Sequence, residues 1–202
     1  MVVGVLSLAA LLGGCSGDSS NGPAMMGGSS STSAGMMGGF SRGMMGSTPS
    51  GYHLSQLTCS APSSLPGTTV YVMVGDMGMT AMMGGSAPLG QHMMLRAVPA
   101  QVPSHQVSFV VGNMGWRTHE LVLLPLGPGQ YAGERVPGAD GKVDETGSLG
   151  EASASCAAGS GEGIKSGTVG WVTLNLPAGR YELACNLRNH YANGMHQLLV
   201  VT

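Results

Sequence analysis

The stretch GRYELACNLRNHYANGMHQLLVVT (179–202) combines two strand-like runs with a loop of metal-binding side chains. Apolar and polar residues alternate through 180–185, which predicts a half-buried strand. Cys185, His190 and Met195 then occur within eleven residues, spaced Cys-x4-His-x4-Met. One thiol, one imidazole and one thioether are soft or borderline ligands for a transition metal. The spacing therefore indicates a metal-binding loop between two strands.

A second imidazole, His119, lies upstream in another apolar run, THELVLLPL (118–126). Two His, one Cys and a weak axial Met form the ligand set of a blue-copper electron-transfer site. The alternative is a buried structural Cys185 beside unrelated residues. We prefer the metal site, since the three companions of Cys185 are the ligand types that such a copper site requires.

The same two segments resemble the cupredoxins, the family of blue type 1 copper proteins. YELACNLRNHYANGM (181–195) is similar to the C-terminal ligand loop of the family, with the spacing of its rusticyanin- and sulfocyanin-like members. NMGWRTHELVLLPL (113–126) is similar to the upstream Asn-turn-His segment, although more residues separate Asn113 from His119 than is usual. The resemblance covers about residues 67–202, most strongly 106–125 and 170–202.

The resemblance implies one type 1 copper per chain, with His119, Cys185 and His190 as equatorial ligands and Met195 as the axial ligand. It also implies a one-electron carrier whose redox protein partners dock on an apolar patch around His190. Backbone N–H groups of 113–118 and 186–190 are expected to hydrogen-bond the sulfur, and such bonds would set the reduction potential.

Apolar, β-branched runs separated by Gly/Pro turns predict an all-β sandwich, and the resemblance implies a cupredoxin-like Greek key. These runs are 68–74, 92–98, 106–112, 118–125, 169–176, 180–185 and 196–202. The region 127–168 is Gly-rich and carries six of the ten acidic residues. We expect it to be a long insertion, with one short helix around LGEASAS (149–155).

The N-terminal run VVGVLSLAALLGG (2–14) is too short to span a bilayer comfortably and is typical of a signal peptide, although no Lys or Arg precedes it. LGGC (12–15) resembles a bacterial lipobox, which implies a lipid on Cys15 and anchoring at the extracytoplasmic face of the cell membrane. The predicted organisation is a lipoprotein signal peptide (1–14), a flexible Met/Gly/Ser-rich tether (15–50) and a cupredoxin domain (51–202).

Cys59 and Cys156 remain once Cys15 and Cys185 have been assigned. An even remainder in an exported protein indicates one disulfide, and the alternative is two isolated small core residues. A zinc site is not expected, because the chain contains no Cys-x2-Cys pair.

Sixteen methionines in 202 residues are clustered, and several occur as pairs. Thioethers favour Cu(I), so the pairs are candidates for secondary Cu(I) sites, with low-complexity drift as the alternative. The candidates are Met25, Met26, Met36, Met37, Met44, Met45, Met82 and Met83. They support a second functional hypothesis, a copper-binding or copper-tolerance lipoprotein.

Composition and motifs exclude several classes of function. A net charge of −2 with 9% charged residues leaves no basic stripe for nucleic acid. Multicopper oxidases need His-x-His pairs, and a binuclear copper site of the oxidase type needs two Cys in one loop; the sequence contains neither. We therefore expect a protein that is not an enzyme.

Overall fold

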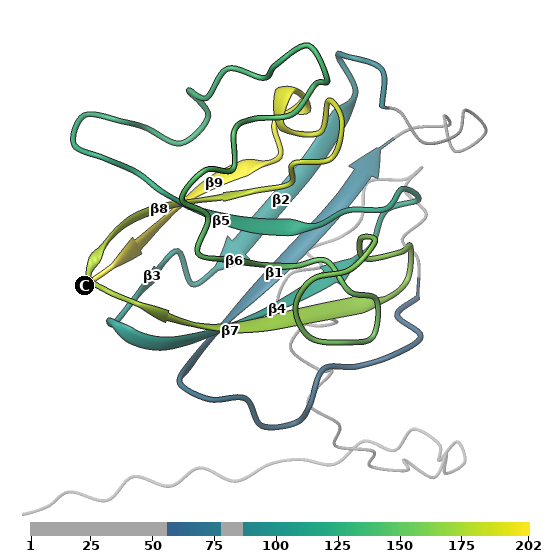
Figure 1. Ribbon diagram of the computed structural model, residues 1–202. Helices are drawn as coiled ribbons and strands as arrows, with labels where there is room; N and C mark the ends of the chain where they lie inside the picture. The colour runs from purple at the N-terminus through teal and green to yellow at the C-terminus, as the bar shows by residue number, and fades with distance from the viewer. Residues whose placement is uncertain (1–55, 78–86) are drawn as a thin grey trace, which may run out of the picture. The chain divides into compact units, whose positions relative to one another are not determined.

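The computed structural model describes residues 56–77 and 87–202, which form a β-sandwich (Figure 1). In chain order its elements are β1 (Thr68–Met77), β2 (His92–Val98), β3 (Gln101–Val102), β4 (His105–Asn113), β5 (Leu121–Pro125), β6 (Gly150–Ala152), β7 (Val169–Leu176), β8 (Gly179–Ala184), the 3₁₀ turn η2 (Tyr191–Asn193) and β9 (His196–Val201). The seven runs expected from the sequence all contain strands, and the two shortest strands, β3 and β6, were not expected.

The strands form two sheets, with the orders β2-β1-β4-β7 and β3-β9-β8-β5-β6. Two neighbouring pairs, β1 with β4 and β3 with β9, are parallel, and the remaining pairs are antiparallel. Because β5, β8 and β9 are neighbours, the segments that flank the predicted ligands lie side by side in one sheet. The predicted all-β sandwich is confirmed.

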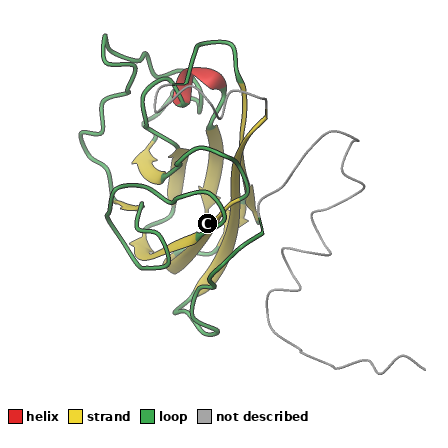
Figure 2. Ribbon diagram, turned by 90° about the vertical axis from the view of Figure 1, so that its right-hand side faces the viewer, coloured by secondary structure: helices red, strands yellow, loops and turns green. Residues whose placement is uncertain are grey.

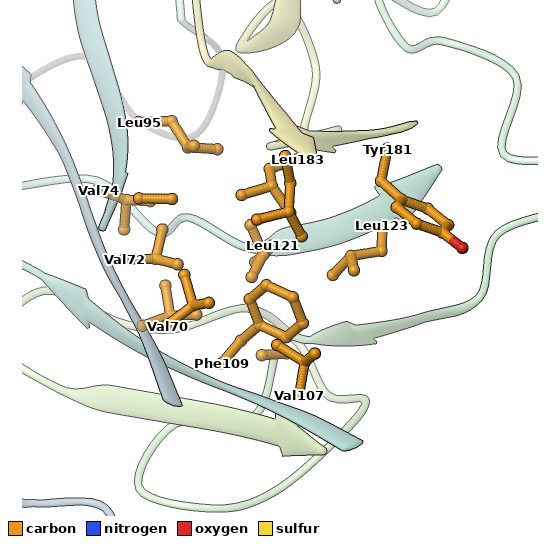
Figure 3. Close-up of a cluster of buried hydrophobic side chains, with 14 of the residues drawn as sticks. Val70, Val72, Val74, Leu95, Val107, Phe109, Leu121, Leu123, Tyr181 and Leu183 are labelled. Carbon is orange, nitrogen blue, oxygen red and sulfur yellow. The ribbon is translucent and has the colours of Figure 1, made fainter. Parts of the chain in front are cut away.

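The core lies between the two sheets, whose inward-facing side chains point toward one another (Figure 3). From the first sheet, Val70, Val72, Val74 and Phe109 are fully buried. From the second sheet, Leu121, Leu123, Leu183 and Leu199 are fully buried. Burying one such side chain contributes roughly 1.5–3 kcal/mol relative to leaving it exposed. Because successive side chains of a strand point to opposite faces of the sheet, every second residue is apolar and packs between the two sheets.

The alternating pattern of strand β8 predicted that one face would be exposed. In the structure the strand is buried on both faces. Tyr181 and Leu183 face the main core, whereas Ala184 packs in a second cluster with Val122, Leu124, Val143 and Tyr191. The connection between β5 and β6 supplies Val143, so this connection covers the outer face of β5 and β8. The prediction failed because the local alternation contains no information about a distant covering segment.

The predicted disulfide is present between Cys59 and Cys156, whose Cα atoms are 5.8 Å apart. Cys59 lies in the segment before β1, which packs through Leu57 and Leu65 against Val110 and other residues of β4 and β7. Cys156 follows β6, and its backbone N–H donates to the carbonyl of Val169. The bridge therefore ties the segment before β1 to the second half of the insertion.

The short helix predicted around 149–155 is absent, and this prediction is wrong. Residues 150–152 form β6 instead, which pairs with Leu121–Leu123 of β5. Gly150 disfavours a helix, and the free edge of β5 offers backbone partners to an extended chain.

The predictions for 1–14, Cys15, the tether and all the candidate Cu(I) methionines lie outside the described residues. No helix in the described part of the chain is long and apolar enough to cross a membrane.

Candidate metal centre

His119, Cys185 and His190 come together in the folded chain, with their donor atoms within 4.8 Å of one another and all three side chains buried. Cys185 directly follows β8, and His190 directly precedes η2, which Figure 2 shows in red at one end of the sandwich. His119 lies between β4 and β5, where its backbone forms an isolated antiparallel bridge with Ile164. Strand β5, which begins two residues after His119, pairs with β8, and this pairing brings the upstream imidazole to the loop.

The spacing of the three donor atoms fits a single metal ion. His119 Nδ1 lies 3.2 Å from His190 Nδ1, and Cys185 Sγ lies 3.3 Å from His190 Nδ1 and 3.9 Å from His119 Nδ1. The circumradius of a triangle with these sides is about 2.0 Å, close to the roughly 2.0–2.3 Å at which imidazole nitrogen and thiolate sulfur bind a first-row metal. One point therefore lies at bonding distance from all three donors.

The protonation chemistry of the cluster also suits metal binding. Burial, with a smaller contribution from Glu120, raises the pKa of the Cys185 thiol to about 12. Burial, and then the neighbouring His119 and Arg117, lowers the pKa of His190 to about 3, so this imidazole is neutral and keeps a lone pair. A metal must therefore displace a proton from Cys185 but not from His190.

The backbone donors at the sulfur differ in part from those expected. Glu120 N–H donates to Cys185 Sγ at 3.3 Å, and the backbone of Leu187 also hydrogen-bonds the thiol. Leu187 lies within the expected range 186–190. Among the described residues, the upstream donor is not in 113–118 but follows His119 directly, because the chain turns into β5 beside the sulfur.

The loop closes on itself and brings Met195 back to the site. Cys185 N–H donates to Met195 C=O at 3.0 Å, and Met195 N–H donates to His190 C=O at 3.3 Å. Gly194 ends the 3₁₀ turn at φ 92°, a conformation that favours glycine. The Met195 side chain is fully buried in the same core cluster as Cys185.

His196 was the competing candidate for the fourth ligand, since side chains of adjacent strand residues point in opposite directions. Its ring instead packs against Tyr191, with 5.0 Å between ring centroids. The Tyr191 hydroxyl in turn donates to Glu182 beneath the insertion. This arrangement favours Met195 over His196 as the residue beside the cluster.

Asn113 organises the turn that leads to His119. Its Nδ2 donates to the carbonyls of Arg117 and Ile164, both at 2.7 Å, and its Oδ1 accepts the N–H of Gly115 at 2.9 Å. The longer spacing between Asn113 and His119 is thus accommodated within a hydrogen-bonded turn.

Two buried carboxylates beside the site were missed by the sequence reasoning. Asp76 Oδ1 lies 3.2 Å from His119 Nε2, and Glu120 Oε1 accepts the N–H of Asn186 at 3.1 Å. Burial, followed by the charges of other carboxylates, raises the pKa of Glu120 to about 7. Burial would raise the pKa of Asp76, but hydrogen bonds from His119 and two backbone N–H groups lower it overall.

A signal for Asp76 was present in the sequence. Val70, Val72, Val74 and Asp76 share one parity in β1, and the first three face the core. A carboxylate at the fourth inward position requires a buried partner.

Two segments distant in sequence hold the outside of the ligand loop. Asn189 Nδ2 donates to the carbonyl of Ala87, and Asn193 Nδ2 donates to that of Pro88, so the chain entering β2 is tied to the loop. From the insertion, Asn186 exchanges hydrogen bonds with the backbone of Val143 at 2.7 and 2.9 Å. The loop is therefore braced on two sides.

Comparison with known proteins gives a fold-level likeness only. No protein-family model matches the chain, and no curated protein matches it. Among solved structures, reduced rusticyanin is 19% identical, with a TM-score of 0.38 over 68% of this chain and 82% of that chain. Auracyanin B is 19% identical, with a TM-score of 0.43 over 75% and 99%. Dithionite-reduced auracyanin from the photosynthetic bacterium Roseiflexus castenholzii is 16% identical, with a TM-score of 0.39 over 67% and 98%.

The types of the donor atoms favour copper. One thiolate, two imidazoles and a neighbouring thioether suit copper in both oxidation states, whereas structural zinc sites use four ligands of the Cys and His type. The two-sheet sandwich thus holds a buried cluster of His119, Cys185 and His190 beside Met195, a donor set that suits one copper ion.

Proposed function

We propose that this protein is a one-electron carrier that holds a single type 1 copper and works at the outer face of the cell membrane. The observation that carries the proposal is the convergence of three buried donors on one point about 2.0 Å from each, a distance typical of ligation. Bound copper supplies a one-electron couple. The chain supplies His119, Cys185 and His190 as equatorial ligands and Met195 as the axial ligand.

The rigidity of the ligand frame favours a carrier over a copper store. His119 is fixed by its backbone bridge to Ile164, and Cys185 by its hydrogen bond to Met195. Ligands that stay in place when the metal changes charge reduce the reorganisation that accompanies electron transfer.

We propose that redox partners dock beside His190, which is 2% exposed. Leu89 supports this location, because its side chain is 69% exposed and its neighbour Gly90 donates to Asn193 of the ligand loop at 2.9 Å. Leu89→Asp is expected to slow electron exchange while the absorption spectrum stays unchanged. An unchanged exchange rate would place docking elsewhere.

Export and lipid anchoring through Cys15 remain part of the proposal. The Cys59–Cys156 disulfide supports an oxidising compartment, since such bonds are rare in the cytosol. Release of the protein from membranes by a Cys15→Ser substitution would test the anchor, and unchanged membrane association would refute it.

The decisive experiment is an absorption spectrum of the Cu(II)-loaded protein followed by a redox titration. We expect a strong thiolate-to-copper charge-transfer band and a reversible one-electron couple. Cys185→Ser should abolish the band, whereas Leu89→Asp, outside the ligand set, should retain it. A Cys185→Ser protein with an unchanged spectrum would refute the proposed function.

A further inference from the structure

His119 uses its two ring nitrogens for different contacts. Nδ1 faces the Cys185 sulfur and His190, whereas Nε2 lies 3.2 Å from Asp76 Oδ1. The side chains of His119 and Asp76 are 0% and 2% exposed, so water does not compete for this contact. A carboxylate only accepts hydrogen bonds, which requires the ring proton to be on Nε2. Nδ1 then keeps its lone pair and directs it toward the other two donors.

The environment of Asp76 keeps it charged and fixed in place. Its Oδ1 also accepts the backbone N–H groups of Trp116 at 2.9 Å and Arg117 at 3.0 Å, and its Oδ2 lies 3.9 Å from Arg117 Nε. Gly115 packs so closely that a Cβ at this position would collide with Asp76 Oδ1. The carboxylate therefore cannot swing away from the imidazole without disrupting the turn before His119.

We propose that Asp76 is a positioning residue of the copper site, which orients His119 and selects its Nδ1-ligating tautomer, and whose negative charge favours Cu(II) over Cu(I). The inference rests on the proposed copper function. Hydrogen bonds from ligating imidazoles to carboxylates fix ring orientation and raise ligand basicity. A nearby anion also interacts more strongly with the doubly charged ion than with the singly charged one. Asp76 lies in strand β1, which contains none of the four ligands. Through this residue, strand β1 would influence the reduction potential of the copper.

A purely structural role for Asp76 makes different predictions. In that case Asp76 would only fix the turn through its hydrogen bonds to Trp116 and Arg117. Loss of these bonds would lower the free energy of unfolding without changing the ratio of Cu(II) to Cu(I) affinity. Asp76→Asn separates the two roles, because it keeps an oxygen that can accept both backbone N–H groups but removes the charge. Asp144→Asn is the matched control, since this exposed aspartate forms a local turn with Thr146 and the charge change is identical.

The first measurement needs no metal and no variant. In the metal-free full-length protein at pH 8, ¹⁵N NMR of the histidine side chains should show the proton of His119 on Nε2. A proton on Nδ1 would overturn the proposal, even if Asp76→Asn failed to fold.

The second measurement compares copper binding by the wild-type protein, Asp76→Asn and Asp144→Asn. Cu(II) affinity should fall by about 10- to 100-fold in Asp76→Asn, the usual effect of changing the partner of a ligating imidazole, because the Asn oxygen can still accept the imidazole N–H but carries no charge. Cu(I) affinity should fall less. A tenfold difference between the two changes raises the potential by about 59 mV for one electron. Asp144→Asn should change neither affinity.

The outcomes distinguish failure of this inference from failure of the copper assignment. If the wild-type protein shows the charge-transfer band but Asp76→Asn has the potential of Asp144→Asn, the inference is wrong and the copper function stands. If the wild-type protein shows no such band, the copper function fails, and the tautomer of His119 still decides whether Asp76 orients the ring.

Discussion

Arg135 and Glu182 form the contact on which docking of the insertion over β8 depends. Arg135 Nε donates to Glu182 Oε2 at 2.7 Å, and Arg135 Nη2 donates to the carbonyl of Pro125 at 2.9 Å. Glu182 is fully buried and also accepts the N–H of Gly133 and the hydroxyl of Tyr191. Arg135→Ala would leave a buried carboxylate with two neutral donors and no counter-charge.

The expected cost of Arg135→Ala follows from this burial. Breaking a buried ion pair by removing one partner costs about 3–5 kcal/mol. The Arg135 side chain is 24% exposed, so part of its charge is already solvated, and we expect the lower end, about 3 kcal/mol. For a chain of this size that corresponds to a fall in Tm of about 6–12 °C. Urea unfolding of the metal-free protein would measure the change directly.

Arg180→Ala provides the control. Arg180 also joins a sheet to the insertion, through a hydrogen bond to Gln130 and a stacking contact 5.3 Å from the Tyr131 ring, but these contacts are exposed. Its loss should cost less than about 1 kcal/mol. The double substitution Arg135→Ala/Glu182→Gln should cost less than the sum of its parts, because the unpaired charge is gone. Equal, small losses in Arg135→Ala and Arg180→Ala would refute the reasoning.

Three further predictions concern the axial ligand, the disulfide and the tether. Met195→Leu should keep copper and colour but raise the potential, because a weak donor to Cu(II) is lost; loss of copper, or a larger spectral change in His196→Ala, would contradict the choice of Met195. The double substitution of Cys59 and Cys156 by Ser should lower the free energy of unfolding by about 2–4 kcal/mol, since the bridge spans 97 residues, and an unchanged urea midpoint would contradict this. Deletion of 24–46 should leave one copper per chain and electron transfer intact, while any extra Ag(I) capacity of the full-length protein disappears; equal Ag(I) capacity would reduce the tether to a spacer.

The strands and the ligand loop could be predicted because their signals are local. Apolar runs separated by Gly/Pro turns indicated the segments that became β1, β2, β4, β7 and β9. Cys185, His190 and Met195 lie within eleven residues, so their proximity needs only one turn. His119 could be selected by ligand type, although the pairing of β5 with β8 is what brings it beside Cys185.

The sequence pattern failed where the environment of a residue depends on a distant segment. Glu182 occupies a polar position of an alternating strand, which predicted exposure, yet it is fully buried beneath Gly133 and Arg135. Asp76 ends an inward-facing row of valines, and only the assembled sandwich brings His119 to it. Charged residues at such positions are informative because burial requires each of them to have a specific partner.

Hydrogen bonds and one backbone bridge hold the donor residues of the cluster in place. His119 is fixed by Asp76 from β1 and by its bridge to Ile164, whereas Cys185 is fixed by Glu120 N–H and by Met195 C=O. Each constraint comes from the folded chain rather than from the ion. Binding therefore needs little ordering of the ligands, and a change in the charge of the ion meets a frame already held by hydrogen bonds. Such a frame benefits a centre that cycles between two oxidation states, and it gives no comparable advantage to a site that only stores metal.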